Sequence, residues 1–245
     1  MMGVSFIRWF FSVHKCGGCG EILDAEHYYE PFCDDCRLAW KASLTASCGD
    51  CFLPAVECRC MPKQLSGAGA LCLRKLFFYE SENSRSPQMS LIYLLKRRKI
   101  GRIIDFVAEN LANLVRGELA ALGLSEENEK FIVTSVPRSK RGIVEYGFDH
   151  AALMAKATVV RLGLEFEPMF YSRFGAKVQK ELGKKQRLEN AKKNIYFSAK
   201  CDISGKYVIL IDDIVTSGAS MAVCTKKLIK NGATGVFCFS LASKK

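Results

Sequence analysis

The chain has 245 residues, 49% of them hydrophobic, which is enough for one large domain or two small ones. Its 36 Lys and Arg against 25 Asp and Glu give a charge of +11, which favours a polyanionic partner, although a solvated basic surface has the same composition. The apolar run 4–11 contains Arg8 and is too short for a membrane span, and no signal-peptide cleavage pattern follows it. We therefore expect a cytoplasmic protein that is not an integral membrane protein, with a short helix at 4–11.

Eight of the twelve cysteines are crowded into residues 16–60. In a cytoplasmic chain this clustering indicates metal binding or reactive thiols rather than disulfides. CGGC at 16–19 and CDDC at 33–36 are separated by thirteen residues, as in a pair of zinc knuckles that form a closed tetrahedral thiolate site. A redox dithiol would instead be a single C-x-x-C after a strand.

A second, less regular group follows, with CGDC at 48–51 and CRC at 58–60. Cys72 is an alternative member, and a cross-braced pairing of first with third knuckle is open. Four thiolates fill all four coordination positions of zinc and leave none open for water, so both sites would be structural. The predicted zinc ligands are Cys16, Cys19, Cys33, Cys36, Cys48, Cys51, Cys58 and Cys60.

Residues 61–72 form a connector that contains Pro, Gly and Ser. Residues 1–72 carry six basic and eight acidic side chains, and residues 73–245 carry thirty and seventeen, so the net charges are −2 and +13. We predict a zinc-ribbon domain at 1–62 and a second domain at 70–245 that carries all of the excess positive charge.

Helix and strand patterns alternate along this second part. Strands are predicted at 74–81, 130–137, 207–212 and 234–242, and helices at 90–115 (in two pieces, split near Gly101), 150–163 and 220–232. This alternation favours an α/β fold with a mainly parallel sheet and helices on both faces. Ligands of such sheets bind beyond the carboxyl ends of the strands.

The stretch VILIDDIVTSGAS, 208–220, ends an apolar strand with two aspartates and continues into a loop of small residues. Backbone N–H groups, hydroxyls and a helix N-terminus after Gly218 would form a cup for a phosphate monoester. Asp212 and Asp213 would repel that phosphate unless a ribose lay between, with its hydroxyls donating to the carboxylates. A Walker B strand is the competing interpretation, but the chain lacks the matching phosphate loop. A plain strand–turn–helix with a charged tip is the other alternative.

VILIDDIVTSGAS resembles the phosphoribosyl-pyrophosphate (PRPP) motif of the type I phosphoribosyltransferases. The chain is similar over most of its length to the ComF family (competence protein F and its relatives), in which a double zinc ribbon is fused to that fold. Further segments carry the resemblance: LIYLLKRRK at 91–99, SVPRSKRGIVEYGFDHAALMA at 135–155, and QKELGKKQRLENAKKNIYF at 179–197. The family's R-G-F-N-Q is here Tyr146 to His150, so this chain lacks a basic residue that would contact an anion.

The resemblance implies roles for the matching residues. PRPP would be held by Asp212, Asp213, Thr216, Ser217, Gly218, Ala219 and Ser220, with a magnesium ion near the carboxylates. Its pyrophosphate would lie along Pro137, Arg138, Lys140 and Arg141. The basic residues Lys177, Lys180, Lys184, Lys185 and Arg187 would form a mobile lid, a nucleic-acid contact or only a solvated helix face.

Three functions follow as hypotheses. A ComF-like protein would handle incoming single-stranded DNA during natural competence, with the PRPP site as regulator or relic. An active phosphoribosyltransferase would need an acceptor, yet Thr216 stands where purine-salvage relatives carry an acidic residue. A zinc-stabilised interaction module would partner a competence helicase or membrane channel.

Overall fold

A four-stranded parallel sheet forms the centre of the computed structural model. Its order is β1–β6–β5–β2, and every neighbouring pair is parallel. The strands are β1 (Cys72–Tyr79), β2 (Phe131–Ser135), β5 (Tyr207–Val215) and β6 (Gly235–Lys244). All four were predicted from the sequence, and the parallel sheet is confirmed.

The structure describes residues 14–24, 26–80, 84–125, 130–173, 184–198 and 200–244. The helix expected at 4–11 and the predicted lid residues Lys177 and Lys180 lie outside these ranges. Lys184 and Lys185 are described by their backbone alone.

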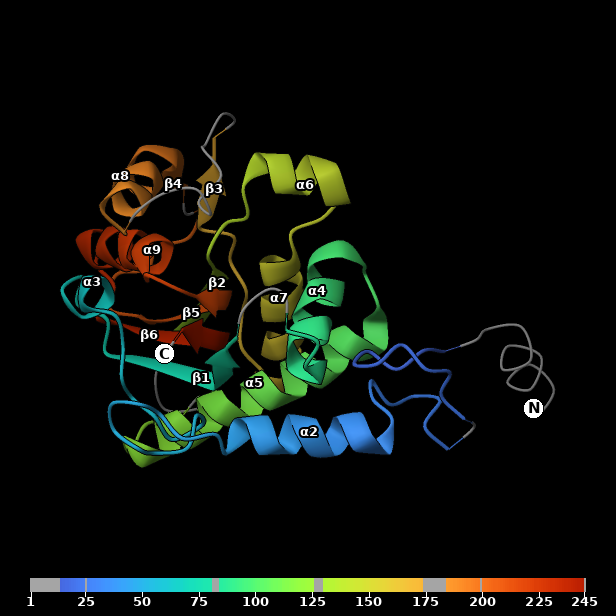
Figure 1. Ribbon diagram of the computed structural model, residues 1–245. Helices are drawn as coiled ribbons and strands as arrows, with labels where there is room; N and C mark the ends of the chain where they lie inside the picture. The colour runs from blue at the N-terminus through green and yellow to red at the C-terminus, as the bar shows by residue number, and fades with distance from the viewer. Residues whose placement is uncertain are drawn as a thin grey trace.

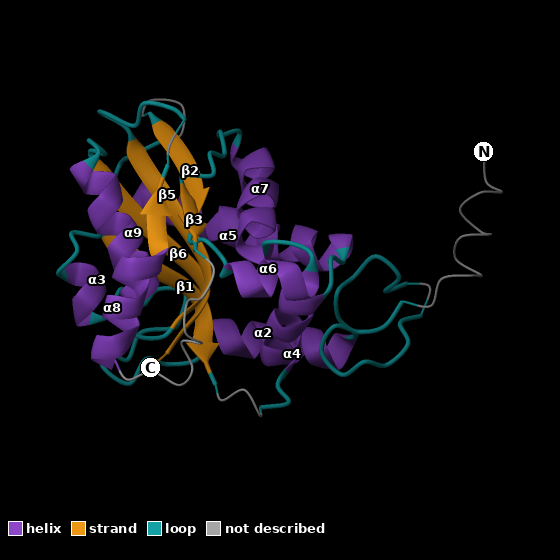
Figure 2. Ribbon diagram, turned by 90° about the horizontal axis from the view of Figure 1, so that it is seen from above, coloured by secondary structure: helices purple, strands orange, loops and turns teal. Residues whose placement is uncertain are grey.

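Helices cover both faces of the sheet, as predicted. One face carries α5 (Gly101–Ala121) and α7 (His150–Leu162), and the other carries α9 (Ala219–Lys230), α8 (Lys184–Asn194) and α3 (Lys63–Ser66) (Figures 1 and 2). Side chains of β5 alternate between two hydrophobic clusters, with Ile209 and Ile211 in one and Val208 and Leu210 in the other. Successive strand residues point to opposite faces, so this near-continuous apolar strand is buried on both sides.

The predicted break near Gly101 separates α4 (Pro87–Arg97) from α5. Asp149 caps α7 by accepting a hydrogen bond from the N–H of Ala152, and Gly163 ends the helix with a left-handed φ of 69°. Four short elements were not predicted from the sequence, because they are too short to show a periodic pattern. They are α3, α6 (Lys140–Tyr146) and the antiparallel pair β3 (Phe170–Ser172) and β4 (Ile195–Phe197). The longer helix α2 (Asp34–Leu44) was not predicted either.

The cysteine-rich part packs directly on the α/β part. Its helix α2 (Asp34–Leu44) carries Trp40, which is 3% exposed. The Trp40 ring lies 5.3 Å from that of Phe77 on β1 and 5.2 Å from that of Phe106 on α5. A buried carboxylate adds a second link, because Glu118 of α5 pairs with Arg74 of β1 and with Arg59, which lies between Cys58 and Cys60. The two predicted domains thus share one hydrophobic core, and we expect them to unfold together.

Substituting Trp40→Ala tests this shared core. The variant should lose about 3–5 kcal/mol of unfolding free energy, the usual cost of truncating a buried tryptophan. Calorimetry should show a single transition that moves to lower temperature. The exposed Leu38 of the same helix provides the control, and Leu38→Ala should change stability by less than about 0.5 kcal/mol. A second, unshifted transition in Trp40→Ala would show that the α/β part unfolds independently.

Candidate functional site

The first cysteine cluster brings together the four sulfurs predicted from the two C-x-x-C pairs. The Sγ atoms of Cys16, Cys19, Cys33 and Cys36 lie within 4.8 Å of one another, and those of Cys19 and Cys33 are 3.8 Å apart. A tetrahedral zinc ion with Zn–S bonds of about 2.3 Å places its sulfurs ~3.8 Å apart. The cluster is therefore compatible with structural zinc.

The backbone around Cys16 favours the thiolate that a metal requires. The N–H groups of Gly18 and Cys33 each donate to Cys16 Sγ at 3.3 Å. Burial raises the pKa of the Cys16 thiol, but backbone hydrogen bonds from Cys19, Cys33 and Gly18 lower it to a net value of about 7. A Cβ atom at Gly18 would lie 2.5 Å from Cys36 Sγ, so glycine is needed for the knuckle to close.

The second cluster repeats this arrangement with Cys48, Cys51, Cys58 and Cys60. The N–H of Asp50 donates to Cys48 Sγ at 3.4 Å, and the Sγ atoms of Cys51 and Cys58 are 3.6 Å apart. Each cluster therefore joins consecutive pairs, and the cross-braced alternative is not adopted. Cys72, the alternative member, is buried in β1 and lies outside both clusters.

The two aspartates lie within β5, at the level where its neighbour β2 ends. Ser135, the last residue of β2, pairs with Ile211, while β6 stays paired with β5 as far as Val215. The predicted strand, which ended at Asp212, is thus three residues too short. Because β2 stops first, Asp213 is free of strand neighbours on that side and meets side chains from two helices.

Asp213 is held by Lys96 of α4 and His150 of α7. Its Oδ2 atom lies 2.9 Å from Lys96 Nζ and 2.8 Å from His150 Nε2, and the residue is 8% exposed. Its Oδ1 atom accepts a hydrogen bond from the N–H of Ile214 at 2.7 Å. Burial raises the pKa of the Asp213 carboxyl, but Lys96 and His150 outweigh burial and hold it well below its usual range.

Asp212 differs from its neighbour. Its Oδ1 atom accepts the N–H of Asp213 at 2.9 Å. Burial and the nearby Asp213 charge raise its pKa well above the usual range for a carboxyl. The pair therefore contains one carboxylate that stays ionised, Asp213, and one that takes up a proton more readily, Asp212.

The predicted phosphate loop turns sharply at Gly218, where φ is 72°, and α9 begins at the next residue. A Cβ atom at Gly218 would lie 3.2 Å from Pro62, so the connector after the second cysteine cluster rests against the loop. Arg187 of α8 donates from Nη1 to Thr216 Oγ1 at 3.3 Å. Of the predicted lid residues, Arg187 thus lies beside the loop.

The predicted pyrophosphate segment, 137–141, runs from the end of β2 into α6. Arg138 is turned inward, with Nη1 donating to Phe148 O at 3.1 Å and Nη2 to Lys96 O at 2.9 Å. Lys140 and Arg141, the first residues of α6, are exposed. The guanidinium carbons of Arg138 and Arg97 lie 4.8 and 5.7 Å from the centre of the Tyr146 ring. Two arginine side chains thus lie beside Tyr146.

A basic cleft of about 820 Å³, here called the α4 cleft, separates the first cysteine cluster from α4. No acidic side chain is among the described residues that line it. Tyr93 is 52% exposed, and the Arg97 guanidinium carbon lies 4.0 Å from its ring centre. The other ring in the lining is His14, and the basic side chains are Lys15, Arg85, Arg98 and Arg102.

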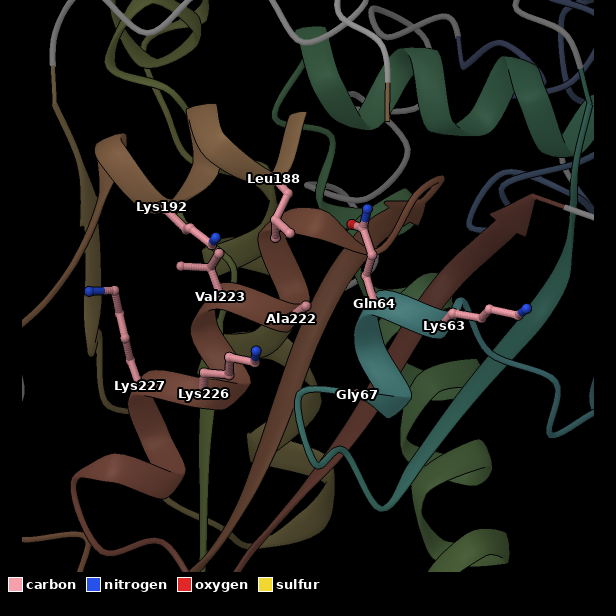
Figure 3. Close-up of a pocket in the computed structure, with 9 residues that line it drawn as sticks. All are labelled: Lys63, Gln64, Gly67, Leu188, Lys192, Ala222, Val223, Lys226 and Lys227. Atoms are coloured by element: carbon pink, nitrogen blue, oxygen red, sulfur yellow. The ribbon is translucent and has the colours of Figure 1, made fainter. Parts of the chain in front are cut away.

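A smaller pocket of about 300 Å³ lies between α3, α8 and α9 (Figure 3). Leu188, Ala222 and Val223 form its apolar surface, and Lys63, Lys192, Lys226 and Lys227 also line it. Lys63 extends away from α9 in this view. The predicted PRPP residues are not in its lining, so it is a separate basic feature.

The sequence interpretation did not predict that Lys96 and His150 contact Asp213. Both lay inside the matched segments, Lys96 in LIYLLKRRK and His150 at the departure from R-G-F-N-Q. A buried aspartate needs a cationic partner, so a lysine or histidine close to Asp213 could have been expected from the sequence. Choosing among the many lysines required the fold, because 117 residues separate Lys96 from Asp213.

The fold and the clusters define a parallel α/β protein with two four-cysteine sites compatible with zinc. No protein-family model matches the chain. It is 26% identical over 226 residues to the DNA utilization protein YhgH of Salmonella typhimurium (strain LT2) and to that of Salmonella typhi, covering 90% of this chain and 93% of each relative.

Solved structures similar to part of the chain include two phosphoribosyltransferases. A hypoxanthine phosphoribosyltransferase from Staphylococcus aureus has a TM-score of 0.38 and 10% identity, covering 57% of this chain and 62% of that one. A purine phosphoribosyltransferase from Pyrococcus horikoshii Ot3 has a TM-score of 0.37 and 16% identity, covering 59% and 75%. Within the described ranges, every helix is too short or too polar to cross a membrane.

The metal content tests the two clusters. Purified protein should carry about two zinc ions per chain, and Cys19→Ser should carry about one and melt at a lower temperature, because site assembly and folding are coupled. Elemental analysis and thermal melting give the readouts. Cys201, which belongs to neither cluster, supplies the control Cys201→Ser, which should keep both ions. Less than about half a zinc per chain in the parent after gentle preparation would contradict the assignment.

Proposed function

We propose that this chain is a ComF-like protein that binds PRPP or another ribose 5-phosphate and handles single-stranded DNA in the cytoplasm. The observation that carries the first half is the Asp212–Asp213 pair, followed within five residues by the Gly218 turn and the start of α9. This ribose-phosphate site (Asp212, Asp213 and residues 216–220) lies at the carboxyl end of β5, where parallel sheets bind their ligands.

Each part of the ligand has a chemical partner in this arrangement. Ribose hydroxyls donate hydrogen bonds, and carboxylates accept them. The 5-phosphate is attracted by the backbone N–H groups and the positive end of α9, with Arg187 beside Thr216. Lys140 and Arg141 are exposed on the side proposed for the pyrophosphate. Magnesium would accompany PRPP through the oxygens of its own pyrophosphate, which are the hard ligands that this ion prefers.

Binding is better supported than group transfer. Transfer from PRPP needs a positioned acceptor and often a base to deprotonate it. Thr216 in the loop has a hydroxyl that accepts a hydrogen bond from Arg187, and it is a poor base at neutral pH. An active phosphoribosyltransferase with an unidentified acceptor is the alternative. A PRPP-consumption assay with a panel of nucleobases separates the two.

The second half of the proposal rests on the YhgH relatives and on the α4 cleft. Their name concerns DNA utilization, and the match covers nine-tenths of this chain. The cleft combines four cations with the exposed ring of Tyr93. Cations attract the phosphate backbone and aromatic rings stack on unpaired bases, which suits a single strand without sequence preference. A zinc-stabilised module that partners a competence helicase or channel is a further alternative.

Replacing both site carboxylates, Asp212→Asn with Asp213→Asn, should weaken ribose 5-phosphate binding. Each lost charge-assisted hydrogen bond should cost roughly 1.5–3 kcal/mol. Calorimetric titration measures the affinity, and a thermal melt reports the cost of leaving Lys96 without its carboxylate. The control pair Asp105→Asn and Asp202→Asn removes two exposed carboxylates elsewhere and should leave affinity unchanged. Parent-like binding by the double variant would mean that the ribose site lies elsewhere.

Binding of a short, fluorescently labelled single-stranded DNA at several salt concentrations tests the α4 cleft. Four cation–phosphate contacts predict a slope of about −3 when the logarithm of the binding constant is plotted against that of salt concentration. Arg85→Gln with Arg98→Gln should reduce the slope by about 1.4. The control Lys41→Gln with Lys200→Gln removes the same charge from exposed positions outside the cleft lining. An equal loss in both pairs would point to a general charge effect and not to this cleft.

A further inference from the structure

Both oxygens of the Asp213 carboxylate already have partners. Lys96 and His150 share Oδ2, and the Ile214 N–H occupies Oδ1. Magnesium takes six oxygen ligands at about 2.0–2.1 Å in strict octahedral geometry. An ion bound directly by Asp213 would have to enter beside the Lys96 ammonium, 2.9 Å from Oδ2. The two cations would repel each other, so the residues present do not fit a magnesium ion held by Asp213.

The lysine has capacity left for a ligand. Its ammonium carries three N–H donors, and among the described residues its ion-pair partner is Asp213. The side chain is 36% exposed, so a ligand that approaches Asp213 from solvent can contact it. Its backbone oxygen accepts from Arg138, and α4 is packed on α2 and α5, so the position of Lys96 is fixed by the fold.

The charge balance of the site also depends on Lys96. Two unpaired carboxylates would repel an anionic sugar phosphate, and in metal-dependent sites a divalent cation removes that repulsion. Here Lys96 neutralises Asp213 from within the chain. We propose that Lys96 supplies the positive charge of the ribose-phosphate site and contacts the ligand itself, so that ribose 5-phosphate binds without a divalent cation. This inference rests on the proposed ribose-phosphate site.

The test is calorimetric titration of the full-length protein with ribose 5-phosphate, in buffer without magnesium and in buffer with it. Chelators are avoided, because they would remove zinc from the cysteine clusters. The parent should bind equally in both buffers. Lys96→Met should bind about tenfold or more weakly without magnesium, the size of a lost charge-assisted hydrogen bond, and magnesium should restore part of the affinity. Lys96→Arg, which keeps the charge, should retain part of the binding without magnesium.

Lys99→Met is the matched control, because Lys99 is an exposed lysine just beyond the same helix and should leave binding unchanged. Thermal melts and zinc content show whether each variant is folded. A parent that binds only with magnesium would overturn the inference, as would Lys96→Met binding like the parent in magnesium-free buffer. If the parent binds no ribose 5-phosphate in either buffer, the proposed function fails, and this inference fails with it.

Discussion

A buried carboxylate needs a cation, and at Asp213 that requirement organises one end of the molecule. Lys96 and His150 come from helices on two different segments and meet on a single oxygen of Asp213. Removing one partner would leave an uncompensated buried charge, which is strongly destabilising. Arg138 extends the network, because it donates to the backbone oxygens of Lys96 and Phe148. The helices that border the proposed ribose-phosphate site are therefore positioned by hydrogen bonds and charge as well as by apolar packing.

Helix α4 connects the two halves of the proposed function. Its Lys96 reaches Asp213, while Tyr93 lines the α4 cleft beside the first cysteine cluster, as does Arg98 just past the helix end. Both sets of side chains lie within six residues of the chain. The proposed DNA contacts and the proposed sugar-phosphate contacts thus share one helix.

The cysteine clusters and the α/β part depend on each other. The cysteine-rich part contributes Trp40 and Phe32 to the core of the sheet, and Glu118 of the α/β part pairs with Arg59 between two predicted zinc ligands. On the opposite face, Pro62 rests against Gly218 of the proposed phosphate loop. Zinc bound at the clusters would therefore stabilise more than the loops that carry it, because those loops support the sheet, α5 and the ligand site.

Elements with strong local patterns could be predicted from the amino-acid order alone. Apolar runs indicated the four strands, helical spacing indicated the break near Gly101, and the cysteine spacing indicated both sulfur clusters, because these signals lie within short stretches of chain. The Asp212–Asp213 pair before a glycine turn was located in the same way. The side chains that meet this pair could be identified only in the folded molecule. Lys96 and His150 are 117 and 63 residues away from Asp213, and such contacts depend on the order of strands and the packing of helices, which local patterns do not encode. The shared core around Trp40 could likewise be identified only in the folded molecule. A charge change and a connector with Pro, Gly and Ser predicted two domains, and their packing against each other depends on long-range contacts.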